Sequence, residues 1–386
     1  MYQVYYNNEL VYDPRAANCA EPGDTTYSMI EGELDISVSA AGQLKMTLAG
    51  GHPLIDKIKV RLGVVKVVEL LGSTSTTIWL GRIIRDTLNI DNSHSYEGEG
   101  RLACLNDTVM PPYIFPDAYV SNPDYQAALA NNTVPEFWLR TLLTRHNEMA
   151  WNADNQIQVG NVTVTGGVFY RAGENWETLW KVLHDDLPGS SLGGNLVMRY
   201  VGDAAYLDYL ADFTDVCGQA VRFGENLMDI TQTDYAADYF NAVIPIGKDG
   251  LTCAGAPNGY YGTDNRYYKS GTYLVSPAER DAGYGNVVKV VTWDEIETAA
   301  GLVNNAVDYL DSVSFVDEVE VSAADLSIVD GISPAFRLGQ MLTISDPPQG
   351  IREAYAIIGL RIDLLGDVET KITLGSRSVS LTSHLA

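Results

Sequence analysis

The sequence is poor in the residues that build most catalytic and metal sites. Its 386 residues include only four cysteines and five histidines. Cys19, Cys104, Cys217 and Cys253 lie far apart and form no C-x-x-C pair, whereas a zinc ribbon or a disulfide framework needs closely spaced or paired cysteines. The spacing therefore excludes both, and we expect four free thiols in packed positions.

Familiar catalytic and membrane signals are also missing. The chain has no H-E-x-x-H, no G-x-S-x-G, no H-x-E with a C-x-x-C partner and no G-x-x-x-x-G-K-[ST] loop. It has no charged-then-apolar leader and no uninterrupted apolar run of about 20 residues. The longest apolar stretch, residues 60–71, is broken by Arg61, Lys66 and Glu69. We expect neither Sec secretion nor membrane insertion.

The histidines give only weak candidate sites. His146 with Glu148 could suggest metal or base chemistry, but no partner ligand stands at helical spacing, so a structural role in a helix is favoured. His184, Asp185 and Asp186 stand together near an expected helix end. Catalysis there would need a nucleophile that the sequence does not place, and Cys19 and Cys217 have acidic neighbours, which raise the pKa of a thiol.

One run of residues combines acids and glycines. Glu97 with Glu99, like Asp185 with Asp186, could suggest a glycosidase pair, but adjacent acids are common in so acidic a chain. Gly98 and Gly100 lack the lysine and third glycine of a phosphate loop, so we interpret them as a tight backbone passage. The sequence therefore predicts no catalytic residue, no cofactor and no metal.

Basic residues are scarce. The chain has 50 Asp and Glu against 25 Lys and Arg, a net charge of -25, which excludes binding of nucleic acid through its phosphates. The charge fits simple solubility, or an acidic surface past which DNA slides without being held.

Length and composition indicate an ordered β-rich protein with about two to four domains at about 150 residues each. The first hundred residues alternate with the period of two that is typical of strands. Expected strands cover residues 3–6, 10–12, 33–39, 44–48, 57–68, 76–84, 86–90 and 96–99. They predict a small antiparallel barrel or sandwich.

The middle of the chain predicts mixed α+β structure. Helical spacing covers residues 122–129, 134–150 and 176–187, the last ended by Pro188 and Gly189. A strand is expected at 159–165 and a hairpin at 196–201 and 204–209.

The last third returns to strands. Expected strands cover 220–223, 241–247, 316–323, 336–344, 354–364 and 370–375, with a hairpin excursion at 251–276 and a helix at 292–310. They predict a second, discontinuous barrel with a helical excursion inside it.

Residues 96–113 lead from strands into a helix that two prolines, Pro111 and Pro112, should stop. This run resembles the end of the first domain of phage and prophage tail hub proteins, the tail-associated or prophage tail endopeptidase family. Further similar stretches are residues 142–147, 159–164, 191–194, 206–210, 226–230, 241–247, 289–294, 336–339, 347–350 and 370–375. Their order spans nearly the whole chain.

The resemblance implies a fold similar to the central hub of contractile-tail baseplates. Residues 1–99 would form the first barrel, 100–212 an α+β domain, and 213–250 with 311–386 the second barrel, while 251–310 would pack with the central domain. A homotrimer of such chains would form a ring that adapts a sixfold tail tube to a threefold tip and lets DNA pass. Its implied partners are the distal tail protein ring, the tape measure protein and tip or receptor-binding proteins, in the tail tip of a virion.

Many relatives continue into a lytic or carbohydrate-binding extension, whereas this chain ends at Ala386, soon after Gly375. We therefore expect a structural protein and not an enzyme. Two alternatives remain: a cell-wall hydrolase, and a host-surface glycan-binding module that would use some of the six tryptophans and 23 tyrosines.

Overall fold

The computed structural model describes residues 1–17, 28–150, 152–190, 192–235, 239–262, 265–293, 296–311, 316–349, 351–366 and 368–375. The chain divides into two compact units. Unit 1 comprises Met1–Thr231 and Glu320–Leu374, and unit 2 comprises Gln232–Val319 and Gly375–Ala386. Cys19 lies outside the described residues, as do the last residues of the predicted second barrel.

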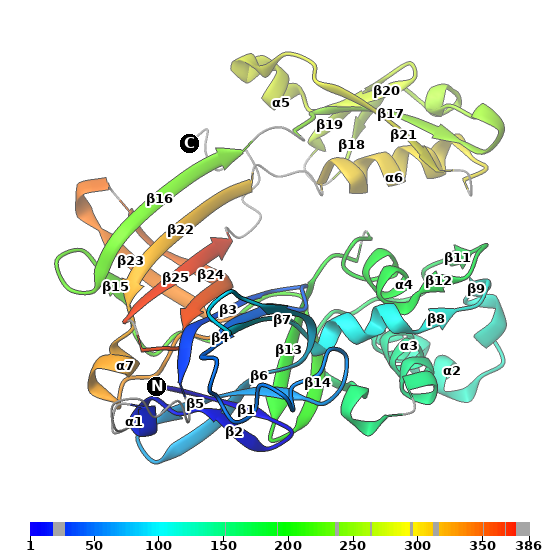
Figure 1. Ribbon diagram of the computed structural model, residues 1–386. Coiled ribbons are helices and arrows are strands. Elements are labelled where there is room, and N and C mark those ends of the chain that lie inside the picture. The colour runs from blue at the N-terminus through cyan, green and yellow to red at the C-terminus, as the bar shows by residue number, and fades with distance from the viewer. Residues whose placement is uncertain are drawn as a thin grey trace. The chain divides into compact units, whose positions relative to one another are not determined.

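A 13-stranded sheet dominates unit 1, and its path runs β16-β22-β25-β24-β3-β4-β7-β6-β5-β1-β2 (Figure 1). The early strands are β1 (Tyr2–Tyr6), β2 (Glu9–Tyr12), β3 (Met29–Ser37), β4 (Gln43–Leu48), β5 (Val65–Leu71), β6 (Thr74–Leu88) and β7 (His94–Gly100). The late strands are β15 (Val221–Arg222), β16 (Leu227–Tyr235), β22 (Val316–Ala324), β23 (Met341–Asp346), β24 (Ile351–Asp363) and β25 (Glu369–Gly375). β15 and β23 pair beside β24, off the main path.

The two groups of strands meet where β3 pairs antiparallel with β24, from Ser37 opposite Gly359 to Glu33 opposite Asp363. The predicted alternation is confirmed, because Leu44, Met46 and Leu48 of β4 are buried. The protein is mainly β, with a large antiparallel sheet. Among the described strands, no pairing closes either group into a ring, so the division into two barrels stays a prediction.

The α+β part of unit 1 follows β7. Its strands are β8 (Val109–Met110), β9 (Tyr113–Phe115), β10 (Gln158–Val162), β11 (Arg171–Gly173), β12 (Glu177–Thr178), β13 (Asn195–Val201) and β14 (Ala204–Leu210). Its helices are α2 (Pro123–Ala130), α3 (Val134–Ala150) and α4 (Leu179–Asp186), with 3₁₀ turns η1 (Arg101–Asp107), η2 (Asp117–Tyr119) and η3 (Ala153–Asn155). Helix α3 occupies the predicted residues and buries Trp138, Leu139, Leu142 and Leu143.

Unit 2 holds a five-stranded sheet of order β18-β19-β20-β17-β21. Its strands are β17 (Ala242–Gly247), β18 (Gly259–Tyr261), β19 (Tyr267–Ser270), β20 (Tyr273–Val275) and β21 (Val288–Trp293), and its main helix is α6 (Ala299–Asp311). The predicted hairpin excursion is confirmed by β18, β19 and β20. Strand β17, which we expected in the second barrel, instead pairs with β20 and β21.

Shorter elements complete the chain. They are α1 (Pro14–Ala17), α5 (Pro277–Glu279), α7 (Leu326–Asp330), the 3₁₀ turns η4 (Lys248–Gly250), η5 (Cys253–Gly255) and η8 (Pro347–Gln349), and the π-helical turn η7 (Arg280–Tyr284).

Three predicted strand or helix starts are wrong because other contacts compete. The strand expected from residue 57 begins at Val65, since the preceding residues form turns that bury Leu54 and Ile58. The helix expected from 292 begins at Ala299, because β21 pairs in parallel with β17. The strand expected from 336 begins at Met341.

The neighbourhood of the predicted proline stop also differs. The helix after β7 is a 3₁₀ helix that ends at Asp107, and β8 follows before Pro111, so the prolines do not end it. The helix expected from 176 begins at Leu179, because Glu177 and Thr178 pair with β8. Trp176, the first residue of the expected helix, lies outside α4 and is 64% exposed.

Candidate functional site

His146 is a buried structural residue. Its ring is 1% exposed and lies between the Thr108 hydroxyl, 2.8 Å from Nδ1, and the Asn155 carbonyl oxygen, 2.9 Å from Nε2. A carbonyl only accepts, so Nε2 donates to Asn155 and Nδ1 accepts from Thr108. Burial lowers the pKa of His146, which favours this neutral form. Glu148 is exposed, and the two residues the sequence paired form no joint site.

The three residues at the end of α4 point to different surroundings. His184 and Asp185 are about half exposed and lie 3.2 Å apart. Asp186 is 5% exposed, and its Oδ2 accepts hydrogen bonds from the Tyr113 hydroxyl and the Trp138 indole, both at 2.8 Å. Burial raises the pKa of Asp186. Its carboxylate ties α4 to α3 and β9, and Asp185 and Asp186 do not face one another as a catalytic pair would.

Glu97 and Glu99 are both engaged by cations on β6. Arg85 donates to Glu97 at 3.1 Å, and Arg82 donates to Glu99 at 2.8 Å and also pairs with Asp107. Because each carboxylate already forms an ion pair with a guanidinium, the hypothesis of a glycosidase pair gains no support.

The glycines between these acids serve packing. A Cβ on Gly100 would lie 1.7 Å from the Ala41 carbonyl oxygen, and one on Gly98 would lie 3.2 Å from the ring of Trp79, which is 1% exposed. The predicted tight backbone passage is therefore confirmed: the glycines let strands close over a buried tryptophan.

The cysteines that the structure describes are free and buried: Cys104, Cys217 and Cys253. Burial raises the pKa of each thiol, which disfavours the nucleophilic thiolate. Within the described ranges, no group of three His, Cys, Asp or Glu side chains could hold a metal ion. No helix in this part of the chain combines the length and hydrophobicity needed to cross a membrane.

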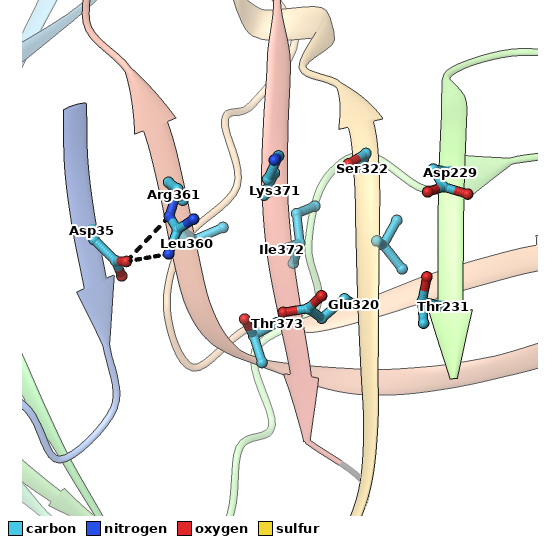
Figure 2. Close-up of a pocket in the computed structure, with 11 residues that line it drawn as sticks. Asp35, Asp229, Thr231, Glu320, Ser322, Leu360, Arg361, Lys371, Ile372 and Thr373 are labelled. Atoms are coloured by element: carbon cyan, nitrogen blue, oxygen red, sulfur yellow. Dashed lines mark hydrogen bonds and ion pairs between the residues drawn. The ribbon is translucent and has the colours of Figure 1, made fainter. Parts of the chain in front are cut away.

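A polar pocket of about 180 Å³ lies on the face of the main sheet, across β3, β24, β25, β22 and β16. Figure 2 shows Arg361 bonded to Asp35, with Lys371, Glu320 and Asp229 on the neighbouring strands. The Arg361 Nη2 to Asp35 Oδ2 distance is 3.0 Å. In strand order, the cations Arg361 and Lys371 lie between Asp35 on one side and Glu320 and Asp229 on the other, so opposite charges are close together on this face (Figure 2).

A larger groove of about 860 Å³ lies along α2 and α3, with Arg145 and Phe137 in its wall. Its volume exceeds that of the polar pocket on the main sheet.

No sequence pattern predicted the ion pair between the buried Glu69 and Arg337. Glu69 is 3% exposed and accepts from Arg337 Nη1 at 3.1 Å, across 268 positions of sequence. One signal was present: Glu69 lies inside the apolar run of residues 67–71, where a charge needs a partner.

The described molecule is thus a mainly β protein without an assembled catalytic or metal centre, built from a large antiparallel sheet, an α+β part and a smaller sheet-and-helix unit. The family model described as prophage endopeptidase tail matches residues 217–385. The comparison with curated proteins gives no match.

Solved structures with the same fold are prophage tail proteins. The 43 kDa tail protein of prophage MuSo2 from Shewanella oneidensis is 11% identical, with a TM-score of 0.59 over 98% of each chain. A tail protein from Neisseria meningitidis MC58 is 11% identical, with a TM-score of 0.56 over 97% of this chain and 96% of that one. Prophage tail protein gp18 from Listeria monocytogenes EGD-e is 10% identical, with a TM-score of 0.50 over 100% and 97%. The predicted resemblance to prophage tail proteins is confirmed.

Proposed function

We propose that the chain is a structural hub protein of a phage tail tip, acting as a homotrimeric ring that adapts a sixfold tube to a threefold tip. The observation that carries the proposal is the likeness of fold to the MuSo2 tail protein over 98% of both chains. In the proposed ring, residues 1–99 supply one β domain of each protomer, and the late strands of the main sheet, β15, β16 and β22 to β25, supply a related second one, without β17, which belongs to unit 2.

The pairing of β3 with β24 supports this use of the sheet. It joins an early and a late group of strands into one unit, so each protomer offers two adjoining blocks of β structure. Three protomers would then present six blocks. A closed heterologous ring, in which one face of each protomer meets a different face of the next, gives this arrangement.

The negative net charge of the chain supports a ring through which DNA passes without being bound. A net charge of -25 repels phosphates, and on the charged sheet face Arg361 is already paired with Asp35. We propose that DNA crosses the ring without specific binding, and that the ring meets the distal tail protein, the tape measure protein and tip or receptor-binding proteins in the virion.

We also propose that the chain itself is not an enzyme. His146 and Asp186 are engaged in buried hydrogen bonds, and Glu97 and Glu99 in ion pairs. The alternatives are a cell-wall hydrolase and a glycan-binding module. Among the described exposed aromatics, Tyr170 and Trp176 flank β11, and Phe223, Tyr260 and Tyr284 come from other parts of the chain. No single observation favours either alternative.

The experiment is light scattering of the purified chain at several concentrations. The hub predicts a particle of three times the 42.1 kDa chain mass, held as the concentration falls. A stable dimer or tetramer would contradict it. If the isolated chain is a monomer, the test becomes whether it forms a trimeric ring when it assembles with the distal tail ring protein.

A further inference from the structure

Strand β21 forms one edge of the five-stranded sheet of unit 2. It pairs in parallel with β17 over its six residues, from Ala242 opposite Val288 to Gly247 opposite Trp293, and no described strand pairs with its other side. Helix α6 covers one face of this sheet, where Val291 and Trp293 pack against its core (Figure 1). In the part of the chain that the structure describes, the outer side of β21 is therefore a regular, open sheet edge.

The backbone of β21 directs a row of hydrogen-bonding groups to this open side. The Ala242 N–H donates to the Val287 carbonyl oxygen at 3.1 Å, so the carbonyl of Val287 points toward β17. Because the N–H and C=O groups of successive strand residues point to alternate sides, those of Val288, Val290 and Thr292 point to the open side. The partner that matches such a row is a second extended polypeptide, whose own N–H and C=O groups have the same spacing.

The features that usually block pairing at a sheet edge are missing from β21. Edge strands commonly carry a proline, a bulge or an outward charge, or are very short. Strand β21 has no proline, and its one charged side chain, Lys289, lies with Nζ 4.8 Å from the ring centroid of Phe240 and 5.5 Å from that of Tyr309, on the face that α6 covers. Strand β18, the opposite edge of the sheet, has only three residues and follows soon after Pro257. The sheet is thus protected at β18 and open at β21.

Apolar side chains accompany the open backbone groups. Val288 and Val290 are 48% and 58% exposed and lie on the sheet face opposite α6, beside Ala242 and Ile244 of β17. An added strand would place its own alternate side chains next to these valines. Apolar residues at every second position of the added strand would therefore bury the valines.

The charge around β21 favours a basic partner over a second copy of the chain. Residues 232–319 include 13 Asp and Glu against five Lys and Arg, and the two residues that follow β21 in the sequence, Asp294 and Glu295, are both acidic. Two copies of so acidic a unit repel one another, whereas a strand that carries Lys or Arg is attracted to it.

We propose that β21 binds an extended segment of another protein as an added strand. The segment has apolar residues at alternate positions against Val288 and Val290, and Lys or Arg beside them. This site lies within unit 2 and does not depend on the ring proposed above, because its test measures peptide binding and not the oligomeric state.

The probe is a library of random short displayed peptides, selected on the full-length chain, and the enriched peptides are then synthesised. We expect them to alternate apolar and polar residues and to contain Lys or Arg. An added strand uses every second backbone N–H, so N-methylation of one alternate set of amides should abolish binding. Methylation of the other set should leave the affinity within about twofold.

Variants at Val290 test the edge directly. Val290→Pro removes an N–H from the open side and none from the ladder with β17, so the chain should fold and bind the peptides about tenfold more weakly. Val290→Thr keeps the N–H and the branched shape and should bind about as the wild type does. Val290→Lys adds a blocking charge and should also lose about tenfold.

The matched control is the same exchange on a different part of the chain. Val216 is 71% exposed in unit 1, and Val216→Lys should leave peptide affinity unchanged. Thermal unfolding checks that each variant folds, and Val290→Lys carries the test if Val290→Pro does not.

Several outcomes would overturn the proposal. They are no enrichment above background, enriched peptides without basic residues, binding that responds equally to both sets of N-methylations, and equal affinities for the wild type and Val290→Lys. Self-association of the chain that disappears in Val290→Lys but not in Val216→Lys would also overturn it, because it would assign the edge to a second copy.

Discussion

Glu69 and Arg337 form an ion pair that joins the early strands of the main sheet to the segment before β23. The Glu69 side chain is 4% exposed and that of Arg337 is 36% exposed. Both carboxylate oxygens of Glu69 accept from the guanidinium. Because the partners are far apart in sequence, this pair forms only when both groups of strands are in place.

Replacing Arg337 should therefore destabilise unit 1. Arg337→Met leaves the Glu69 carboxylate buried and unpaired, and removing one partner of such a pair costs about 3 kcal/mol. Chemical denaturation followed by circular dichroism measures this. Arg361→Met is the control: its pair with Asp35 is 50% and 41% exposed, so the loss should stay below about 1 kcal/mol. Equal losses would show that burial of Glu69 does not matter.

Gly100→Ala should be destabilising for a steric reason. The new Cβ would lie 1.7 Å from the Ala41 carbonyl oxygen, so the backbone beside Trp79 must shift. Overpacking of this kind costs about 1–3 kcal/mol. At Gly167 a Cβ meets only Asn132 Oδ1 at 3.5 Å, so Gly167→Ala should be close to neutral. Thermal unfolding of the two variants checks the difference, and a neutral Gly100→Ala would refute the packing role.

The stability should fall in mildly acidic solution because of His146. Burial lowers its pKa in the folded protein, so below about pH 6.5 the unfolded chain takes up a proton that the folded chain resists. This stability is present above the unfolded pKa and is lost as the pH falls toward the folded pKa. His52, whose pKa burial also lowers, adds to the same slope.

His146→Gln should flatten that slope without abolishing it. The measurement is the free energy of unfolding between about pH 5 and 8. His184→Gln serves as the control, since the His184 side chain is 45% exposed. An unchanged slope in His146→Gln would mean that the ring is not held neutral.

The purified chain should not degrade cell walls. The hydroxyl that contacts His146 belongs to Thr108, which is buried with it, and in the described structure neither His146 nor His184 belongs to a group that could hold a metal ion. A zymogram with cell-wall substrate should show no clearing for the wild type. Clearing that disappears in His146→Ala or His184→Ala, with folding intact, would restore the hydrolase alternative.

Local patterns predicted much of the fold. The helix at 134–150 was predictable because its apolar spacing and Pro135 near its start agree with the core it faces. The hairpin of β13 and β14 follows from Gly202 at a positive φ in a tight turn. Such elements depend on residues close together in sequence.

The wrong predictions concern residues whose partners lie far away in the sequence. The helix expected from 292 would include Thr292 and Trp293, yet these two residues end β21 and pair with Ile246 and Gly247 of the distant strand β17. Glu177 and Thr178 leave their helix for β8 in the same way.

The most direct measurement of the central claim is negative-stain imaging of the chain assembled with the distal tail ring protein. A hub of this kind should appear as a closed threefold ring of this chain seated on the sixfold ring, with an open centre. Particles in which single chains decorate the ring separately, or in which no complex forms between two folded proteins, would contradict it.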